Sequence, residues 1–289
     1  MIEVSGLSKR YGDVVAVDDL TFTVEPGAVT GFLGPNGAGK TTTMRMILGL
    51  DAPSSGRARV LGARLADLPE PMRAVGALLD AGGVHPRRSA RDHLRCLAVS
   101  NRLRRQRVDE VLDLVGLTAA AHRHAGAFSL GMLQRLGLAA ALLGDPGVLI
   151  LDEPVNGLDP EGIVWIRTLL RGLAAEGRTV LVSSHLMAET AVTADRLIVV
   201  ARGRMIADTT VEALARPDGV LVRTADPRRL ARELVTQGAS DVAPAGAELL
   251  VRGLSAERIG EVAAAEGVVL HELTPRRASL EEAFMELTR

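Results

Sequence analysis

The sequence predicts an α/β protein that carries a smaller α+β domain at its C-terminus. Short apolar runs that suit buried strands, such as 29–33, alternate with segments of helical periodicity. A glycine-rich loop, Gly34–Thr41, connects that run to a helix-like stretch, and near the end of the chain short strands and helices alternate again. We therefore expect a first domain over 1–213 and an accessory domain over 214–289.

Composition excludes several classes of protein. The 289 residues carry a formal net charge of −1, which gives no indication of nucleic-acid binding. The longest apolar runs, such as 197–201, are far shorter than the ~18 to 20 residues that span a bilayer, and the N-terminus lacks the pattern of a signal peptide. Cys96 is the only cysteine, which excludes an internal disulfide, and we expect it to be a small apolar residue in a helix. The expected location is the cytoplasm, with no nucleic-acid partner.

The N-terminal residues 2–33 are expected to form strands. Apolar and polar residues alternate from Leu20 to Glu25, and Pro26 with Gly27 marks a turn before the buried run. Tyr11 is the only tyrosine. Its ring could stack on an adenine base, and the alternative is an ordinary surface tyrosine.

The loop after the buried run fits the phosphate-binding pattern G-x-x-x-x-G-K-S/T. Glycines let the backbone wrap around an anion, and the helix that follows adds its N-terminal N–H groups and positive dipole end. Lys40 can reach the β- and γ-phosphates, and Thr41 can ligate Mg²⁺. These features predict a P-loop NTPase core. The candidate nucleotide contacts in this segment are Gly34, Pro35, Asn36, Gly37, Ala38, Gly39, Lys40, Thr41 and Thr42.

The next part of the chain is expected to add a strand at 57–61, a helix at 64–73 and a buried strand at 75–79 that ends at Asp80. From about 84 to 145 the pattern is helical, which predicts a helical subdomain inserted into the α/β core.

Within the helical stretch, 87–107 holds eight arginines and a single acid. Such a run is usually a solvated face, and the alternative is docking against an anionic membrane surface or a membrane partner. His122 and His124 are two residues apart and do not share a helix face, so a metal site there is not expected.

Two segments beyond the helical stretch are expected to bind or process phosphate. Phe128–Met132 precedes an apolar helix at 133–143 and is a second candidate anion site. Asp152 and Glu153 follow the apolar run 148–151, and two carboxylates at the end of a buried strand suit a cation or a reacting water. Asp152 is therefore expected to serve Mg²⁺ and Glu153 to polarise the attacking water; a purely structural pair is the alternative.

A turn with another acid, Asp159, comes next and precedes a helix at 163–175. A buried strand at 179–182 leads to His185, which could contact the γ-phosphate, although a lone histidine is more often structural. A hairpin over 197–207 is expected to close the core.

With these motifs in order, the chain resembles the nucleotide-binding subunit of ABC transporters over roughly 2–213. The resemblance implies a head-to-tail homodimer, with ATP held between the phosphate loop of one subunit and Ser129 and Gly131 of the other. It also implies that a separate permease subunit spans the membrane and that this chain is peripheral on the cytoplasmic face. The implied roles are adenine stacking for Tyr11, phosphate binding for Lys40, Mg²⁺ binding for Thr41 and Asp152, general base for Glu153, communication between sites for Asp159, and γ-phosphate sensing for His185.

Two departures from the family pattern stand out. The usual signature is L-S-G-G-Q, and here Phe128, Leu130 and Met132 replace the leucine, the first glycine and the glutamine. The serine and glycine expected to approach phosphate are kept. Asp80 stands where the family has glutamine; a carboxylate could still hold Mg²⁺ or a water, but it lacks the amide donor and adds negative charge.

The last 76 or so residues lie outside the ATPase core and resemble the accessory domain on ATPase subunits of bacterial drug and antibiotic exporters. A capping box at Ser279 predicts a final helix with Phe284 and Leu287. Dimer support or regulation is the expected role. The other elements expected in this part are strands at 220–223, 249–252 and 268–273 and helices at 228–236 and 256–266.

Together these features predict an ATP-hydrolysing subunit that powers an exporter, with ATP and Mg²⁺ as its cofactors. The alternative is a soluble nucleotide-dependent regulatory module without a membrane partner. Aspartate at position 80, in place of the family's glutamine, would fit this alternative. A phosphoryl-transferring kinase is disfavoured by the signature segment and by His185.

Overall fold

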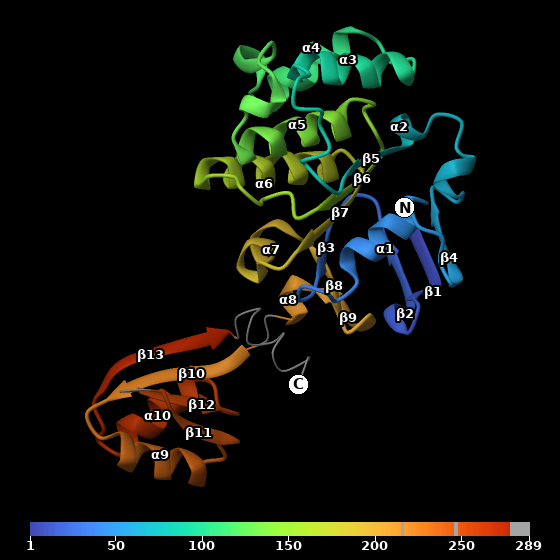
Figure 1. Ribbon diagram of the computed structural model, residues 1–289. Coiled ribbons are helices and arrows are strands. Elements are labelled where there is room, and N and C mark those ends of the chain that lie inside the picture. Colours follow the sequence, from blue (N-terminus) through green and yellow to red (C-terminus); the bar gives the residue numbers. More distant parts are fainter. Residues whose placement is uncertain (215–216, 246–247, 278–289) are drawn as a thin grey trace. The chain divides into compact units, whose positions relative to one another are not determined.

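The computed structural model describes residues 1–214, 217–245 and 248–277. The chain divides into two compact units, one over Met1–Val211 and one that begins at Glu212 (Figure 1). Within the described ranges, no helix is both long and apolar enough to cross a membrane.

A six-stranded sheet in the order β5-β6-β7-β3-β8-β9 forms the centre of the first unit. All neighbours pair in parallel except β8 and β9, which form the expected closing hairpin. Every residue of β3 and β7 is buried, which explains why apolar and polar residues do not alternate along these strands. The strands are β3 (Val29–Leu33), β5 (Val75–Leu78), β6 (Val148–Asp152), β7 (Thr179–Ser184), β8 (Arg196–Ala201) and β9 (Arg204–Thr210).

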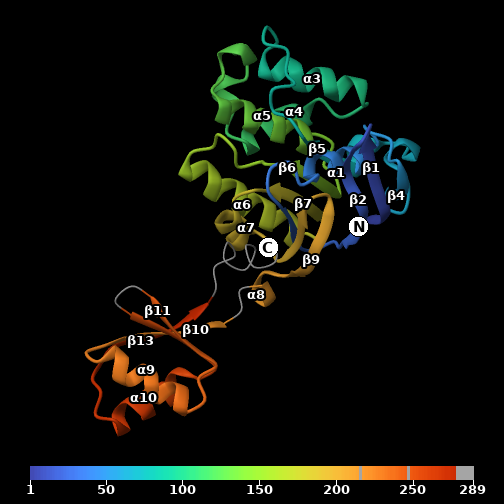
Figure 2. The same ribbon diagram turned by 60° about the horizontal axis from the view of Figure 1, so that its bottom comes forward.

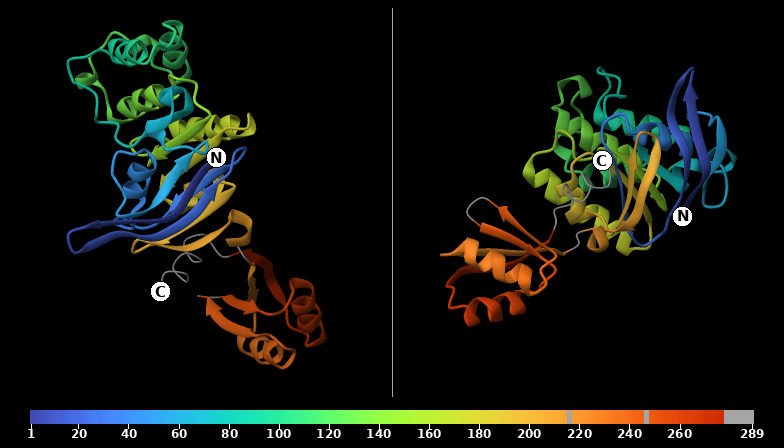
Figure 3. Two further views of the ribbon diagram at one scale, coloured as in Figure 1. Left: turned by 90° about the vertical axis from the view of Figure 1, so that its right-hand side faces the viewer. Right: turned by 90° about the horizontal axis from the view of Figure 1, so that it is seen from below.

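An antiparallel sheet in the order β2-β1-β4 lies over one face of this centre, with β1 and β2 as long neighbouring strands (Figure 3, left). Its strands are β1 (Ile2–Tyr11), β2 (Val14–Val24) and β4 (Ser55–Val60). Helix α1 (Lys40–Ile47) shares one apolar core with both sheets, to which Phe22, Met44 and Ile150 contribute. The phosphate loop is therefore fixed at both of its ends by packed elements.

The remaining helices of the first unit cover the other face of the central sheet and build the helical insertion (Figure 1). Helices α6 (Pro160–Ala175) and α7 (Met187–Thr193) pack near β3 and β7. The insertion consists of α3 (Ala90–Ser100), α4 (Gln106–Leu114) and α5 (Leu130–Leu142), with 3-10 turns at Thr118–Ala120 and Ala125–Ala127. The expected P-loop core, N-terminal strands and helical insertion are confirmed.

One expectation for this unit is wrong. The stretch 64–73 is not one helix but a 3-10 turn, Leu65–Asp67, and a short helix, α2 (Pro71–Ala74). Pro69 lies between them, and a residue before proline is driven out of the helical region; Leu68 is accordingly extended. Cys96 lies on helix α3, as expected, and its side chain is exposed.

The second unit is a four-stranded antiparallel sheet in the order β11-β12-β10-β13, with α9 and α10 on one face (Figure 2). Its core contains Val222, Leu230, Val251 and Ile259. The elements are β10 (Pro217–Thr224), α9 (Pro227–Thr236), β11 (Asp241–Ala245), β12 (Glu248–Arg252), α10 (Ala256–Ala265) and β13 (Leu270–Arg277), after a short α8 (Val211–Leu214).

Strand β11 was not expected from the sequence. It is an edge strand of five residues that includes Pro244, and proline in a short run argues against a strand unless the strand lies at an edge. The final helix expected after Ser279 lies outside the described residues.

Candidate functional site

Gly34 and Gly39 of the phosphate loop occupy positions that no other residue can take without a shift. A Cβ on Gly34 would collide with the carbonyl oxygen of Val200. Gly39 precedes the first residue of α1, has a φ of 99°, and would place a Cβ 2.5 Å from the carbonyl oxygen of Ala16. These contacts place the loop tightly against β2 and β8. The N–H of Ala38 donates to the carbonyl oxygen of Pro35 within the loop, and the glycines leave room for an anion to approach the backbone.

Lys40 is the buried cation of the site, with 7% of its surface exposed. Its Nζ donates to the carbonyl oxygens of Gly34, at 2.6 Å, and Pro35, at 3.4 Å, and lies 3.8 Å from Glu153 Oε1. Burial lowers the pKa of Lys40, and the charges of Glu153 and Asp152 act against that shift. The ammonium is thus held inside the loop, where a phosphate oxygen could take the place of a carbonyl acceptor.

Asp152 stands at the end of β6 between two hydroxyl groups. Thr41 Oγ1 donates to its Oδ2 at 2.5 Å, and Ser183 Oγ donates to its Oδ1. Asp152 and Ser183 are paired residues of the parallel strands β6 and β7, so the sheet register brings them together. A hydroxyl and a carboxylate at this distance form the hard oxygen donor set that suits Mg²⁺.

Glu153 is held at both its backbone and its side chain. Its φ of 49° is unusual for a residue with a side chain, and its N–H donates to Ser183 Oγ at 3.0 Å while its carbonyl accepts from Gln134 Nε2 at 3.2 Å. Glu153 Oε2 lies 2.8 Å from His185 Nδ1. The strained turn therefore aims the carboxylate at the phosphate loop and at His185 together.

These groups surround a hollow of about 360 Å³. Its lining brings together the expected loop residues from Pro35 to Thr42 with Asp152 and Glu153, and it adds Ala16 from β2. The volume and the mixture of backbone donors, one ammonium and two carboxylates suit a polyphosphate with a cation.

Among the expected site residues, Tyr11, Gly34, Asp80 and His185 do not line this hollow. The ring of Tyr11 is half-exposed, and its hydroxyl donates to Asp51 Oδ2 at 3.1 Å while Lys9 Nζ lies 4.9 Å from the ring centre. Asp80 is exposed, and its Oδ1 accepts a hydrogen bond from the N–H of Gly82 at 2.7 Å. The exposed ring remains available for stacking, whereas the Asp80 carboxylate is turned to its own loop.

Ser129, Gly131 and Asp159 also lie away from this hollow. Ser129 is the exposed N-cap of α5, and its Oγ accepts from the N–H of Met132 at 3.3 Å. Asp159 caps α6 by accepting from the N–H of Gly162 at 2.9 Å. Ser129 and Asp159 thus each cap a helix, and neither they nor Gly131 line the hollow beside the phosphate loop.

Two residues that support Asp152 and Glu153 were not expected from the sequence, Ser183 and Gln134. Both are buried, with 0% and 7% of their surface exposed. The available signals were a serine directly after an apolar strand and a single glutamine inside an apolar helix. Neither pointed to a partner, because the contact of Ser183 with Asp152 depends on strand register and that of Gln134 on helix packing.

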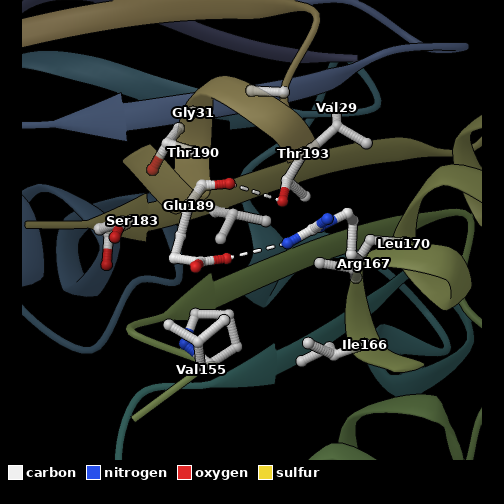
Figure 4. Close-up of a pocket in the computed structure, with 14 residues that line it drawn as sticks. Val29, Gly31, Val155, Ile166, Arg167, Leu170, Ser183, Glu189, Thr190 and Thr193 are labelled. Carbon is white, nitrogen blue, oxygen red and sulfur yellow. Dashed lines mark hydrogen bonds and ion pairs between the residues drawn. The ribbon is translucent and has the colours of Figure 1, made fainter. Parts of the chain in front are cut away.

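A second, smaller cavity lies between α6, α7 and the strands β3 and β7 (Figure 4). Arg167 and Glu189 form an ion pair of 3.0 Å beside it, and Thr193 Oγ1 donates to the carbonyl oxygen of Glu189 at 2.8 Å. Its volume of about 20 Å³ is enough for roughly one water. This cavity is a packing seam and not a ligand site.

Comparison with known proteins agrees with this geometry. A family model described as ABC transporter matches residues 17–156, and a domain of unknown function, DUF8746, matches residues 218–281. The chain is 36% identical to YhcH, an uncharacterised ABC transporter ATP-binding protein of Bacillus subtilis, over 100% of this chain and 96% of the relative. It is 40% identical to the bacitracin transport ATP-binding protein BcrA of Bacillus licheniformis, over 75% and 72%. It is 36% identical to the Nod factor export ATP-binding protein I of Burkholderia orbicola, over 99% and 96%.

Solved structures give the same assignment. The structure of an ATP-binding subunit of an ABC transporter superposes with a TM-score of 0.68 at 30% identity, over 75% of this chain and 92% of that one. The resemblance found in the sequence is thereby confirmed. The chain belongs to the ATP-binding subunits of ABC transporters, a family of ATPases.

Proposed function

We propose that this chain binds ATP and Mg²⁺ at the phosphate loop and hydrolyses the γ-phosphate to drive an exporter. One observation carries the proposal: the phosphate loop, the Asp152 carboxylate and the strained Glu153 surround a single hollow of suitable size. In this assignment Lys40 and the loop N–H groups bind the phosphates. Thr42 lies in the first turn of α1 and belongs to the same phosphate-binding segment.

Thr41 and Asp152 are the residues that would hold Mg²⁺, which supplies charge neutralisation for the phosphates when it is bound. Ser183 donates to Asp152 and so orients the carboxylate. No role in metal binding is needed for Asp80, whose carboxylate accepts a hydrogen bond from Gly82.

Glu153 acts as the general base that orients and deprotonates the attacking water. Its carboxylate is 3.8 Å from Lys40 Nζ and 2.8 Å from His185 Nδ1, so a water near the γ-phosphate would be within reach of both Glu153 and His185. His185 would then sense the γ-phosphate through its contact with the base. A general base of this type contributes about 10²-fold or more to turnover.

The site is complete only when two copies meet head to tail. Ser129 and Gly131 do not line their own chain's hollow, and the exposed N-terminus of α5 offers N–H groups to the phosphates of a nucleotide on another copy. Asp159 would link the two sites across the dimer, and the exposed ring of Tyr11 would stack on the adenine. Loss of the γ-phosphate removes these shared contacts and lets the copies part.

For the approach and separation of the two copies to drive transport, a separate permease subunit is required. That subunit would hold the chain at the cytoplasmic face of the membrane. The relatives named for Nod factor export support transport out of the cell. The exported substrate is recognised by the permease in this scheme.

The deciding experiment compares wild type with Glu153→Gln. We expect the variant to keep ATP binding, to lose about 10²-fold or more in turnover, and to accumulate as a dimer in ATP and Mg²⁺. Light scattering measures the dimer fraction, and specific activity should rise with protein concentration in the wild type. Unchanged turnover would refute the base assignment, and the absence of hydrolysis and of an ATP-dependent dimer would favour a regulatory module without a membrane partner.

A further inference from the structure

Two consecutive residues at the start of α5 contact one glycine in the turn that precedes α6. Leu130 and Gly157 are so close that a Cβ built on Gly157 would lie 2.5 Å from both Cγ and Cδ2 of Leu130. A Cβ on Gly131 would lie 2.8 Å from the carbonyl oxygen of Gly157. Both distances are shorter than the contacts that a real Cβ makes, so a side chain at 157 would displace Leu130.

The turn that contains Gly157 is itself fixed between two helix N-termini. Gly157 has a φ of 76°, and the next residue, Leu158, lies so close to α6 that a Cβ on Gly162 would be 3.2 Å from its Cβ. Asp159 then caps α6. The turn thus touches α5 through Gly157 and α6 through its next two residues, and a shift at one helix end is transmitted to the other.

We propose that the contact between Leu130 and Gly157 sets the distance between Ser129 and Asp159, so that the phosphate-facing end of α5 and the Asp159 turn move as one piece. Leu130 and Gly157 are positioning residues in this scheme, because they act through their neighbours and touch no nucleotide. The inference rests on the proposed function, in which Ser129 binds the nucleotide of the other copy and Asp159 links the sites.

Leu130 also replaces a glycine of the usual signature, and the packing shows what the larger side chain does. The Leu130 side chain fills the space next to Gly157 that a glycine at 130 would leave open. At the same time 60% of the surface of Leu130 stays exposed. The substitution therefore ties the signature segment to the turn more closely than a glycine could.

A double-mutant cycle in the Glu153→Gln background tests the coupling. The variants are Gly157→Ala, Leu130→Gly and the pair, and light scattering gives the ATP concentration at half-maximal dimer. We expect Gly157→Ala to raise this concentration about tenfold, because the new methyl group displaces Leu130, and the pair to return to within about threefold of Leu130→Gly alone. ATP affinity at protein concentrations too low for dimers should be unchanged, since the phosphate loop is not involved.

Gly177→Ala is the matched control. Gly177 also has a positive φ, 89°, but nothing lies within 4 Å of the position of a Cβ, so this variant reports the backbone strain alone. In the Glu153→Gln background, Gly177→Ala should reach half-maximal dimer at the same ATP concentration as Glu153→Gln alone.

Each failure has a distinct meaning. If Glu153→Gln alone forms no ATP-dependent dimer, the proposed function fails and the inference fails with it. If that dimer forms and Gly157→Ala leaves the half-maximal ATP concentration unchanged, or the pair remains as impaired as Gly157→Ala, only the inference is overturned.

Discussion

Ser183→Ala removes the hydroxyl group that connects the Asp152 carboxylate to the backbone N–H of Glu153. In the structure, Ser183 Oγ donates to Asp152 Oδ1 and accepts from the N–H of Glu153 at 3.0 Å. The serine is fully buried, so alanine fits sterically and only the hydrogen bonds are lost.

The cost follows from the type of bond. A hydrogen bond to a charged group contributes about 1.5–3 kcal/mol and a neutral one about 0.5–1.5 kcal/mol. Because Asp152 is only partly buried, water replaces some of the first bond, and we expect the free energy of unfolding to fall by about 2–3 kcal/mol. Without its N–H acceptor, Glu153 also loses part of the support for its positive φ, and displacement of a catalytic group by about 1 Å lowers turnover by about 10²-fold.

The assay follows unfolding in denaturant by the fluorescence of Trp165, the only tryptophan, and ATP turnover at saturating nucleotide. Ser184→Ala is the matched control, because Ser184 is also buried but exchanges its hydrogen bonds with Leu186 rather than with a carboxylate. We expect the control to lose about 1–2 kcal/mol of stability and to keep turnover within about threefold of wild type.

Wild-type turnover in Ser183→Ala would refute the claim that this hydroxyl positions Glu153. Equal losses of turnover in both serine variants would refute it as well, since the control leaves Asp152 and Glu153 untouched.

Three further predictions concern the loop and the helical insertion. Lys40→Ala should weaken ATP binding about 10- to 100-fold, measured by titration calorimetry, because a buried charge-assisted contact to phosphate is lost. Gly34→Ala should lower the free energy of unfolding by about 1–3 kcal/mol in denaturant titrations, because its methyl group meets the carbonyl oxygen of Val200. Burial and the charge of Arg88 lower the pKa of His93, so the unfolded chain binds that proton more readily and stability falls as the pH drops below about 6.5; His93→Gln should flatten this fall.

Each of these has a contradicting result. ATP affinity that survives Lys40→Ala would remove the lysine from the phosphate site. Wild-type stability of Gly34→Ala would mean that the loop relaxes away from β8. Parallel stability curves for wild type and His93→Gln between about pH 7 and 5 would show that other groups dominate the acid response.

The central strands and the phosphate loop could be predicted because their physical requirements are local. A strand buried on both faces lacks the alternation of apolar and polar residues, as β3 and β7 do, and an anion-binding turn must contain glycine where φ is positive, as at Gly39. The prediction of one helix over 64–73 was wrong for a local reason too. Pro69 and Pro71 interrupt the helix there, although the apolar spacing favours one.

By itself the sequence determined which residues could bind phosphate and cation, because those residue types and their spacing along the chain are what the chemistry demands. Only the tertiary structure decided which of them meet. Strand register placed Ser183 between the Asp152 carboxylate and the N–H of Glu153, helix packing brought Gln134 to the backbone of Glu153, and the approach of α5 to the turn before α6 set Leu130 against Gly157. These contacts join residues far apart in the chain, and their free energy depends on distances of a few ångströms that no local pattern of residues encodes.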